Sequence, residues 1–339
     1  MGVKAPVAIW GAGAIGGVIG AHLVRAGHSV RFVDIVVDHV AAMRATGLRI
    51  TGPVVSFRVS ADATLPDTID ETFGTVLLCV KAHHTASAVR MLAPHLDPDG
   101  IVVSVQNGLN APVIAEVVGA ARTFGCFVNF GADYLEPGVI HYGGRGTLAV
   151  GEDGRLTPRA RAIHTLFNAF DERTILTDNV RGYLWGKLAY ASMLFATALS
   201  DESIADALDR PAHRSTYAAL AREVVLVARA ERIRLEPFDG FDPAAYDATS
   251  TVAATTASLD ALVAHNRRSA KTHSGIWRDL AVHRRPTEVD AQLGSVVEAG
   301  RRHRIGTPLN ARLIEMIHQI ERGARTQRTS NLAELGGIA

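Results

Sequence analysis

The sequence has little cysteine: Cys79 and Cys126 are the only two in 339 residues. Both lie in stretches that predict β-strands, so we interpret them as inert core thiols and not as a disulfide framework. A local redox role is the less favoured alternative. A chain without disulfides is typical of a reducing compartment, and we therefore expect a cytoplasmic location.

An excess of one charge is also lacking, because 35 Lys and Arg oppose 34 Asp and Glu for a formal net charge of +1. Such a balance provides no long-range field for nucleic acid, an anionic membrane or an acidic tail. The apolar stretch 183–199 is too short, and too interrupted by Lys187, to span a bilayer. Residues 1–6 fit neither a lipidation nor an export signal. We expect no nucleic-acid partner, no membrane partner and no metal site.

Glycine, by contrast, is concentrated near the start of the chain. The apolar run 7–10 is followed by Gly11-Ala12-Gly13-Ala14-Ile15-Gly16 and then by an amphipathic run to Arg25. A strand that turns tightly into a helix, lets its backbone approach a pyrophosphate and packs closely afterwards needs glycine at each of the three positions. The six residues from Gly11 to Gly16 are therefore predicted to bind a dinucleotide.

Asp34 follows Gly16 by eighteen residues and ends the second apolar run, 30–34. An acidic residue at this place accepts hydrogen bonds from the ribose hydroxyls and repels a 2′-phosphate. No Arg or Lys follows until Arg44. We therefore predict NAD(H) as the preferred cofactor and keep NADP(H) as the alternative.

The two halves of the chain differ in pattern. The first half alternates helical patterns with strand-like runs, which are 7–10, 30–34, 76–80, 101–105, 124–130 and 148–151. This alternation is typical of a doubly wound, mainly parallel sheet, an α/β fold of the Rossmann type. After about residue 180 only helical patterns follow, over 218–228, 257–263, 289–299 and 309–320. We expect a Rossmann domain over 1–180, an all-helical domain over 181–325, and a poorly ordered or loosely docked tail over 326–339.

Within the helical half, Thr287 has an acidic residue, Asp290, three positions later. This spacing predicts a capping box at the start of the helix over 289–299.

In open α/β sheets the ligand crevice lies at the carboxyl ends of the strands. Lys81, Asn107 and Ala132 come at or just after the third, fourth and fifth predicted strands and are candidates for the cofactor site. Asn107-Gly108 is equally typical of a plain turn. Lys81 has the alternative interpretation of a solvated charge at a strand end.

Lys187 lies on an apolar helical stripe, together with Leu184, Leu188, Ala191, Leu194, Phe195 and Ala198. A buried unpaired ammonium costs stability, so such a lysine extends to solvent, pairs with a carboxylate or changes its pKa. The stripe taken by itself favours a lysine that extends to solvent at the edge of a core helix. A catalytic lysine is the alternative.

These motifs together resemble the ketopantoate reductase family, the 2-dehydropantoate 2-reductases. The resemblance runs over nearly the whole chain, and it is carried by Gly11–Gly16, Cys79-Val-Lys81-Ala, Gln106-Asn107-Gly108-Leu109, Gly131-Ala132, Pro137-Gly138-Val-Ile-His141, Leu184-Trp185-Gly-Lys187-Leu188, Arg285-Pro-Thr-Glu288-Val-Asp290 and Gly306-Thr-Pro308-Leu-Asn310. It implies that Lys187 is the general acid, that Glu288 contacts the cofactor and helps to arrange the active site, and that Lys81 and Asn107 contact the cofactor.

The chain departs from the family pattern where the substrate would bind. The resemblance predicts Asn four and eight residues after the catalytic lysine, but these positions are Ala191 and Phe195. Loss of hydrogen-bond partners disfavours a polar substrate such as ketopantoate and favours an aliphatic or aromatic side chain. In the segment 271–279 the register is uncertain, and Ser274 and Trp277 are further candidates for substrate contact.

We therefore expect an NAD(H)-dependent enzyme that interconverts a small-molecule 2-oxo acid and a 2-hydroxy acid. One alternative is an NADPH-dependent 2-dehydropantoate 2-reductase, and another is a sensor that binds NAD(H) without catalysis. The sequence does not determine the oligomeric state, and a homodimer is kept as a hypothesis.

Overall fold

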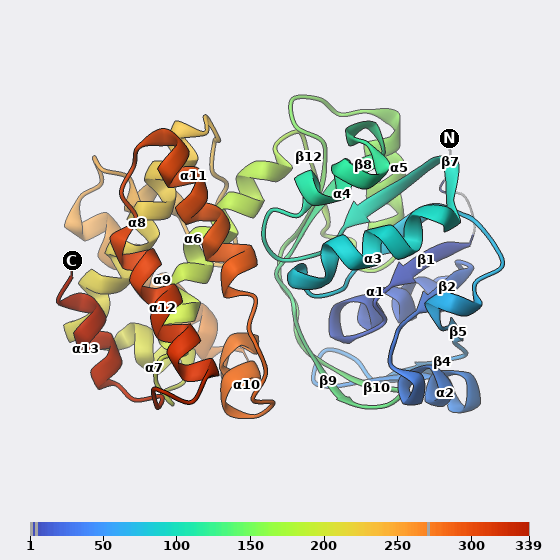
Figure 1. Ribbon diagram of the computed structural model, residues 1–339, viewed down its shortest axis with the longest axis horizontal. Coiled ribbons are helices and arrows are strands. Elements are labelled where there is room, and N and C mark those ends of the chain that lie inside the picture. Colours follow the sequence, from blue (N-terminus) through green and yellow to red (C-terminus); the bar gives the residue numbers. More distant parts are fainter. Residues whose placement is uncertain (1–2, 4–5, 270–271, 339) are drawn as a thin grey trace. The chain divides into compact units, whose positions relative to one another are not determined.

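The computed structural model describes residues 3, 6–269 and 272–338. The chain divides into two compact units, Met1–Val180 and Arg181–Ala339, drawn from blue to green and from yellow to red in Figure 1. None of the described helices is long and apolar enough to cross a membrane.

The first unit is built on an eight-stranded sheet with the order β12-β11-β8-β7-β6-β1-β2-β5. Its strands are β1 (Val7–Trp10), β2 (Val30–Val33), β5 (Asp62–Thr64), β6 (Phe73–Leu78), β7 (Leu96–Ser104), β8 (Thr123–Val128), β11 (Leu148–Gly151) and β12 (Ile175–Thr177). All neighbours are parallel except β8 and β11. All four residues of β1 are buried, as expected for a strand covered on both faces. The predicted mainly parallel α/β sheet is confirmed.

Five helices accompany this sheet: α1 (Ala14–Arg25), α2 (Val37–Thr46), α3 (Thr85–Leu92), α4 (Ala111–Val118) and α5 (Pro158–Asn168). The chain passes from β1 to β2 on one side and later returns to place β6 on the other side of β1. This reversal makes the carboxyl end of β1 a topological switch point, where open α/β sheets bind their ligands.

The first unit also contains a second sheet, which the sequence patterns did not predict. Its order is β4-β3-β10-β9, and its strands are β3 (Leu48–Thr51), β4 (Phe57–Val59), β9 (Gly131–Glu136) and β10 (Val139–Gly144). The sheet packs against α1. At Gly17, a Cβ atom would lie 2.1 Å from Cδ1 of Ile140 on β10, so glycine permits this close packing.

The second unit is helical, as predicted, and among its described residues the β-pairing is limited to one bridge, between Phe238 and Phe241. The helices are α6 (Val180–Thr197), α7 (Ile204–Asp209), α8 (Arg214–Ala230), α9 (Val252–Arg267), α10 (Gly275–Ala281), α11 (Ser295–His303), α12 (Pro308–Glu321) and α13 (Ser330–Gly336). A π-helical turn over Asp290–Gly294 leads directly into α11. Such turns are rare and are frequent at functional sites.

The C-terminal segment differs from the poorly ordered or loosely docked tail that we expected. Its side-chain and backbone donors reach the two carbonyls that directly follow α6: the Gln327 amide donates to Ala198 O, and Arg328 N and Asn331 Nδ2 donate to Leu199 O, at 2.8–2.9 Å. In α13, Leu332 and Leu335 are completely buried. The expectation was wrong because a short amphipathic helix among polar residues gives little signal before its binding surface is known.

Candidate functional site

The three motif glycines occupy three different environments at the carboxyl end of β1. Gly11 has a φ of +96°, and a Cβ there would lie 2.8 Å from Val80 N. At Gly16 a Cβ would lie 2.1 Å from Gly11 O, so the close packing of α1 on the turn requires glycine. At Gly13 a Cβ would meet no protein atom within 4 Å. Protein packing therefore does not account for Gly13, and its open backbone leaves room for a ligand to approach.

Gly13 is the N-cap residue of α1. No side chain caps this end of the helix, and its first turn contains no acidic residue. The first amide groups of a helix have no partners within the helix and carry partial positive charge. An open backbone and a helix N-terminus without an acidic residue in its first turn fit a pyrophosphate. The geometry of Gly11–Gly16 thus fits a dinucleotide.

Asp34 follows β2 and fixes the glycine-rich turn. Its Oδ2 accepts a hydrogen bond from Ala12 N at 2.8 Å, and its Oδ1 accepts one from Val36 N at 2.9 Å. Each carboxylate oxygen can accept more than one hydrogen bond, so the side chain retains the capacity to bind hydroxyl groups. The structure therefore brings Asp34 and the glycine-rich turn together.

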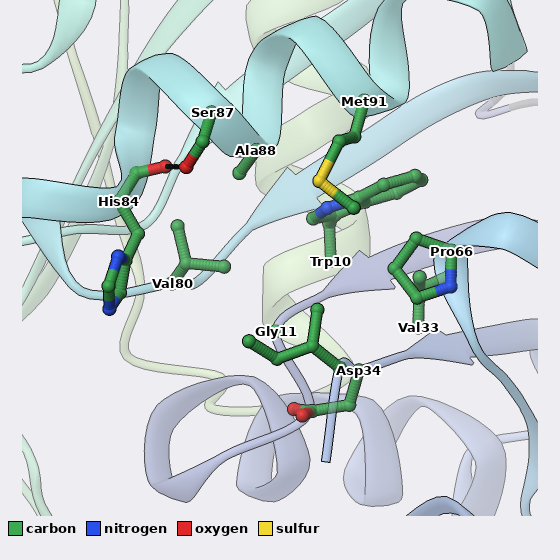
Figure 2. A pocket seen from close by; sticks show the side chains of 11 residues that line it. Trp10, Gly11, Val33, Asp34, Pro66, Val80, His84, Ser87, Ala88 and Met91 are labelled. Atoms are coloured by element: carbon green, nitrogen blue, oxygen red, sulfur yellow. Dashed lines mark hydrogen bonds between the residues drawn. The ribbon is translucent and has the colours of Figure 1, made fainter. Parts of the chain in front are cut away.

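A pocket lies beside this carboxylate, at the ends of β1, β2 and β6 (Figure 2). Its lining residues are Trp10, Gly11, Val33, Asp34, Ile35, Pro66, Val80, His84, Ser87, Ala88 and Met91. In Figure 2, Val80, Ala88 and Met91 lie across the pocket from Asp34. The lining is largely apolar with one carboxylate at its edge, and none of these described lining residues is Lys or Arg. Such a pocket suits a flat base attached to a ribose.

Arg44, the first Arg or Lys after Asp34, forms its hydrogen bonds away from the pocket. Arg44 Nε donates to Ala63 O at 2.6 Å, and its Nη2 donates to Thr64 Oγ1 at 3.4 Å. Arg44 thereby holds α2 to β5.

Lys81 and Asn107 lie after neighbouring strands, β6 and β7, as their predicted place at strand ends requires. Buried Gln106 connects the two strand ends, because its Nε2 donates to Val80 O at 2.9 Å and to Thr85 Oγ1 at 2.8 Å. Asn107 O accepts from Asn110 Nδ2 at 2.8 Å, and Gly108 has a φ of +85°. The turn expected at this position is therefore present. Cofactor contact by Lys81 and Asn107 stays a prediction.

We expected Ala132 to lie at the end of the fifth strand of the main sheet, but it does not. That strand, β8, stops at Val128, and Ala132 lies in β9 of the second sheet, opposite Tyr142. The continuous apolar run concealed the change from one sheet to the other. A cofactor contact by Ala132 stays a prediction.

Sequence reasoning missed His84, Ser87 and Met91, which line the pocket from the start and face of α3. Ser87 Oγ donates to His84 O at 2.9 Å, which Figure 2 shows as a dashed line. Their spacing, one helical turn apart after the third strand, is the signal that could have identified them.

Lys187 lies in α6, whose side chains are mostly buried. On this helix Leu184, Lys187 and Leu194 are half-buried and share one stripe. Ala191, on the same stripe, retains 5% exposure, whereas Phe195 retains none. Phe195 is thus a core residue of the second unit, and substrate contact by Ala191 or Phe195 stays a prediction.

Glu288 lies just before the helix that continues into α11, and it is 8% exposed. The capping box expected here does not form. Thr287 N donates to Glu321 Oε1 of α12 at 2.7 Å, and Asp290 Oδ1 is bound by His318 Nε2 at 3.0 Å. Asp290 is therefore not the partner of the Thr287 amide.

Ser274 and Trp277 lie together at the start of α10. Ser274 Oγ caps this helix by accepting from Trp277 N at 3.1 Å. The Trp277 ring stacks near His273, with centroids 4.1 Å apart, and its Nε1 donates to Asp201 Oδ1 at 3.4 Å. The Ser274 hydroxyl can still donate a hydrogen bond, but its orientation is set by the helix cap. Lys271, also in this predicted loop, lies outside the described residues.

A Rossmann unit with a glycine-rich turn that fits a dinucleotide, followed by an all-helical unit with a lysine in its first helix, is the architecture of a class of nicotinamide-dependent oxidoreductases. The model of the family "Ketopantoate reductase PanE/ApbA" matches residues 7–154, and the model of its C-terminal domain matches residues 179–321. The chain therefore belongs to the ketopantoate reductase family.

Relatives and solved structures agree with this membership. The 2-dehydropantoate 2-reductase of Halobacterium salinarum is 29% identical over 321 residues, which cover 93% of this chain and 99% of the relative. A crystal structure of a PanE/ApbA family ketopantoate reductase from Ralstonia eutropha JMP134 is 27% identical and covers 94% of this chain and 98% of its own, with a TM-score of 0.77. D-mandelate dehydrogenase with NADH and anilino(oxo)acetate has a TM-score of 0.82 at 19% identity, covering 94% and 98% of the two chains, and shows a shared fold.

Proposed function

We propose that the protein is an NAD(H)-dependent oxidoreductase that interconverts a 2-oxo acid and a 2-hydroxy acid. The observation that carries this proposal is Lys187, a cationic side chain on the half-buried stripe of α6, in a chain of this family whose stretch 183–199 is otherwise uncharged. A positioned lysine can donate a proton to an oxygen that becomes an alkoxide.

The preference for NAD(H) is supported by the pocket beside Asp34. A carboxylate at its edge suits two ribose hydroxyls, and the absence of Lys and Arg among the described lining residues leaves a 2′-phosphate without a counter-charge. The D-mandelate dehydrogenase whose fold this chain shares is described with NADH.

The nicotinamide cofactor, when bound, supplies hydride to the substrate carbonyl carbon. Lys187 donates a proton to the carbonyl oxygen in the reductive direction and accepts it in the oxidative direction. Glu288, buried and at the start of a helix, holds the reacting groups in register and contacts the cofactor. Ser274 and Trp277 are proposed to contact the substrate.

The substrate is proposed to carry an aliphatic or aromatic side chain. Named relatives act on 2-dehydropantoate, but Ala191 and Phe195 present no hydrogen-bonding group on the Lys187 helix. The hydroxyl of ketopantoate would have no hydrogen-bonding partner on this helix, so the enzyme would lose its selectivity for ketopantoate over apolar 2-oxo acids. The D-mandelate dehydrogenase that shares this fold is described in a complex with anilino(oxo)acetate, an aromatic compound, and this supports the proposal.

The test is the rate of turnover across a panel of 2-oxo acids with NADH and with NADPH. The panel contains ketopantoate, branched aliphatic acids and aromatic acids. NADH-dependent reduction of an apolar 2-oxo acid supports the proposal. Ketopantoate as the best substrate with NADPH supports the alternative, 2-dehydropantoate 2-reductase activity. NADH binding without turnover of any acid supports a sensor.

We further propose that the protein is a cytoplasmic homodimer. Two cysteines without a disulfide, Cys79 and Cys126, support the compartment. The ketopantoate reductase of Staphylococcus aureus, whose chain shares the fold with a TM-score of 0.71 at 17% identity, is described as dimeric. Light scattering at several protein concentrations tests the oligomeric state.

A further inference from the structure

The segment that presents Glu288 is held from both sides by one pair of residues on α12. Before Glu288, the amide and the hydroxyl of Thr287 donate to Glu321 Oε1 at 2.7 and 2.8 Å. After Glu288, Asp290 Oδ1 lies 3.0 Å from His318 Nε2. His318 Nδ1 also lies 2.7 Å from Glu321 Oε2, which joins the two anchors into one cluster.

This cluster replaces the local capping box. In a capping box the acidic residue at the third helical position binds the amide of the N-cap residue. Here Glu321, from a different helix, binds the Thr287 amide, and Asp290 is turned toward His318 instead. The Thr287 hydroxyl still accepts a hydrogen bond from Val289 N at 3.3 Å, so α12 fixes the start of the helix in addition to its own first turn. The π-helical turn over Asp290–Gly294 follows immediately.

The charge state of His318 decides how many of these bonds can form. Both of its partners are carboxylates, which accept only, and a neutral imidazole has a single N–H. An imidazolium donates from both nitrogens and satisfies Glu321 and Asp290 at once. Among the described residues, the charged groups that face His318 are Asp290, from the π-helical turn, and Glu321, from its own helix.

We propose that protonated His318 is a positioning residue, which acts through Glu321 and Thr287 to hold Glu288 in the geometry that the reaction needs. This inference rests on the proposed role of Glu288. Burial lowers the pKa of His318, but the hydrogen bonds to Glu321 and Asp290 outweigh burial and leave the pKa above its usual range. We call the hydrogen bonds of His318 and Glu321 to Asp290 and Thr287 the clamp. The clamp is complete below the usual pKa of histidine and is lost as the pH rises through the raised pKa of His318.

The experiment compares wild type with His318→Gln, His318→Lys and His303→Gln. Glutamine keeps a hydrogen-bonding side chain but no charge, and lysine keeps a charge throughout the assay range. His303 is the matched control, because its Nε2 binds the carboxylate of Glu231 at 3.0 Å and it lies at the opposite end of α11 from residues 287–290. The first readout is kcat/KM for the best 2-oxo acid against pH. The second is hydrogen exchange of peptides that contain residues 287–290, corrected for the intrinsic effect of pH.

We expect kcat/KM of His318→Gln to fall by about two- to tenfold at the acidic end of the profile, the fold-change for one net hydrogen bond. In this variant the fall of kcat/KM at alkaline pH should also lack the contribution from the titration of His318. Its peptides that contain residues 287–290 should exchange hydrogen faster. His318→Lys restores both readouts and also lacks that contribution, while His303→Gln resembles wild type. If His318→Gln keeps the wild-type pH profile and exchange, the proposal is overturned.

The two readouts separate this inference from the proposed function. Absence of turnover in wild type with every 2-oxo acid, together with faster exchange of 287–290 in His318→Gln, supports the clamp and rejects the enzyme assignment. Turnover in wild type with unchanged exchange and unchanged pH profile in His318→Gln rejects the clamp and keeps the enzyme.

Discussion

The carboxylate of Asp34 should determine which nicotinamide cofactor is accepted, and the decisive perturbation is Asp34→Ala combined with Ile35→Arg. Ile35 lines the same pocket and is 68% exposed, so arginine can be placed there without disturbing the core. The single change Asp34→Ala also removes the acceptors of Ala12 N and Val36 N. We therefore expect both variants to have a less ordered glycine-rich turn.

The magnitude follows from charge and distance. A phosphate monoester carries about −1.5 to −2 charges, and a unit pair at about 4 Å in water interacts by about 1 kcal/mol. A 2′-phosphate beside Asp34 is thus disfavoured by about 1–3 kcal/mol, which is about 5- to 150-fold in affinity. Loss of the ribose hydrogen bonds in Asp34→Ala weakens NADH binding by about tenfold. In the double variant the guanidinium attracts the phosphate, and we expect the preference to narrow or reverse.

The assay measures the dissociation constants of NADH and NADPH by nucleotide fluorescence, and kcat/KM with each. Wild type should prefer NADH by at least about tenfold in kcat/KM. Asp38→Ala is the matched control, since Asp38 is an exposed carboxylate in the first turn of α2. Equal or better use of NADPH by wild type, or the same loss of NADH affinity in Asp38→Ala, would refute the role given to Asp34.

Three further outcomes are expected. Lys187→Met should fold and bind NADH but lose about two to four orders of magnitude in turnover, the usual contribution of a general acid; near-wild-type turnover would show that the lysine only extends to solvent. Ala191→Asn should raise kcat/KM for ketopantoate relative to apolar 2-oxo acids in a substrate panel. Phe195→Asn should do the same, but it should also lower the free energy of unfolding, measured by urea denaturation, by about 3–5 kcal/mol because a fully buried ring is lost. If ketopantoate is already the best substrate of wild type, both expectations are contradicted. Asn331→Ala should lower the free energy of unfolding by about 1–3 kcal/mol, since buried Asn331 donates to Leu199 O and Thr326 O and accepts from Arg325; unchanged unfolding would mean that the C-terminal segment is not stabilised by this side chain.

The sequence predicted the features that depend on neighbouring residues. The strand β1, the glycine-rich turn and α1 follow one another without interruption, so their pattern is local and was recognised. The second sheet was not predicted, because β3 pairs with β10 across almost ninety residues and its strands are short. The same reason explains Ala132, whose strand changes sheets within an apolar run.

The site residues also divide into those with a local sequence signal and those without one. Asp34 and Lys187 were identified because a charge among apolar residues is visible in the sequence. His84, Ser87 and Met91 were missed, since ordinary helical residues acquire a role only when α3 is placed beside the pocket. The cluster of Thr287, His318 and Glu321 joins residues more than thirty positions apart, and no local pattern indicates it.

The hydrogen bonds between the C-terminal segment and the turn after α6 affect when the second unit can complete its folding during synthesis. The carbonyls of Ala198 and Leu199 accept hydrogen bonds from residues made about 130 positions later. Domains generally fold as units, the N-terminal one first, while the chain is still being made. The first unit can therefore assemble early, whereas the turn that follows the Lys187 helix keeps open carbonyls until residue 331 has emerged. Nascent chains that stall before this point should retain a folded Rossmann unit and a protease-sensitive helical unit.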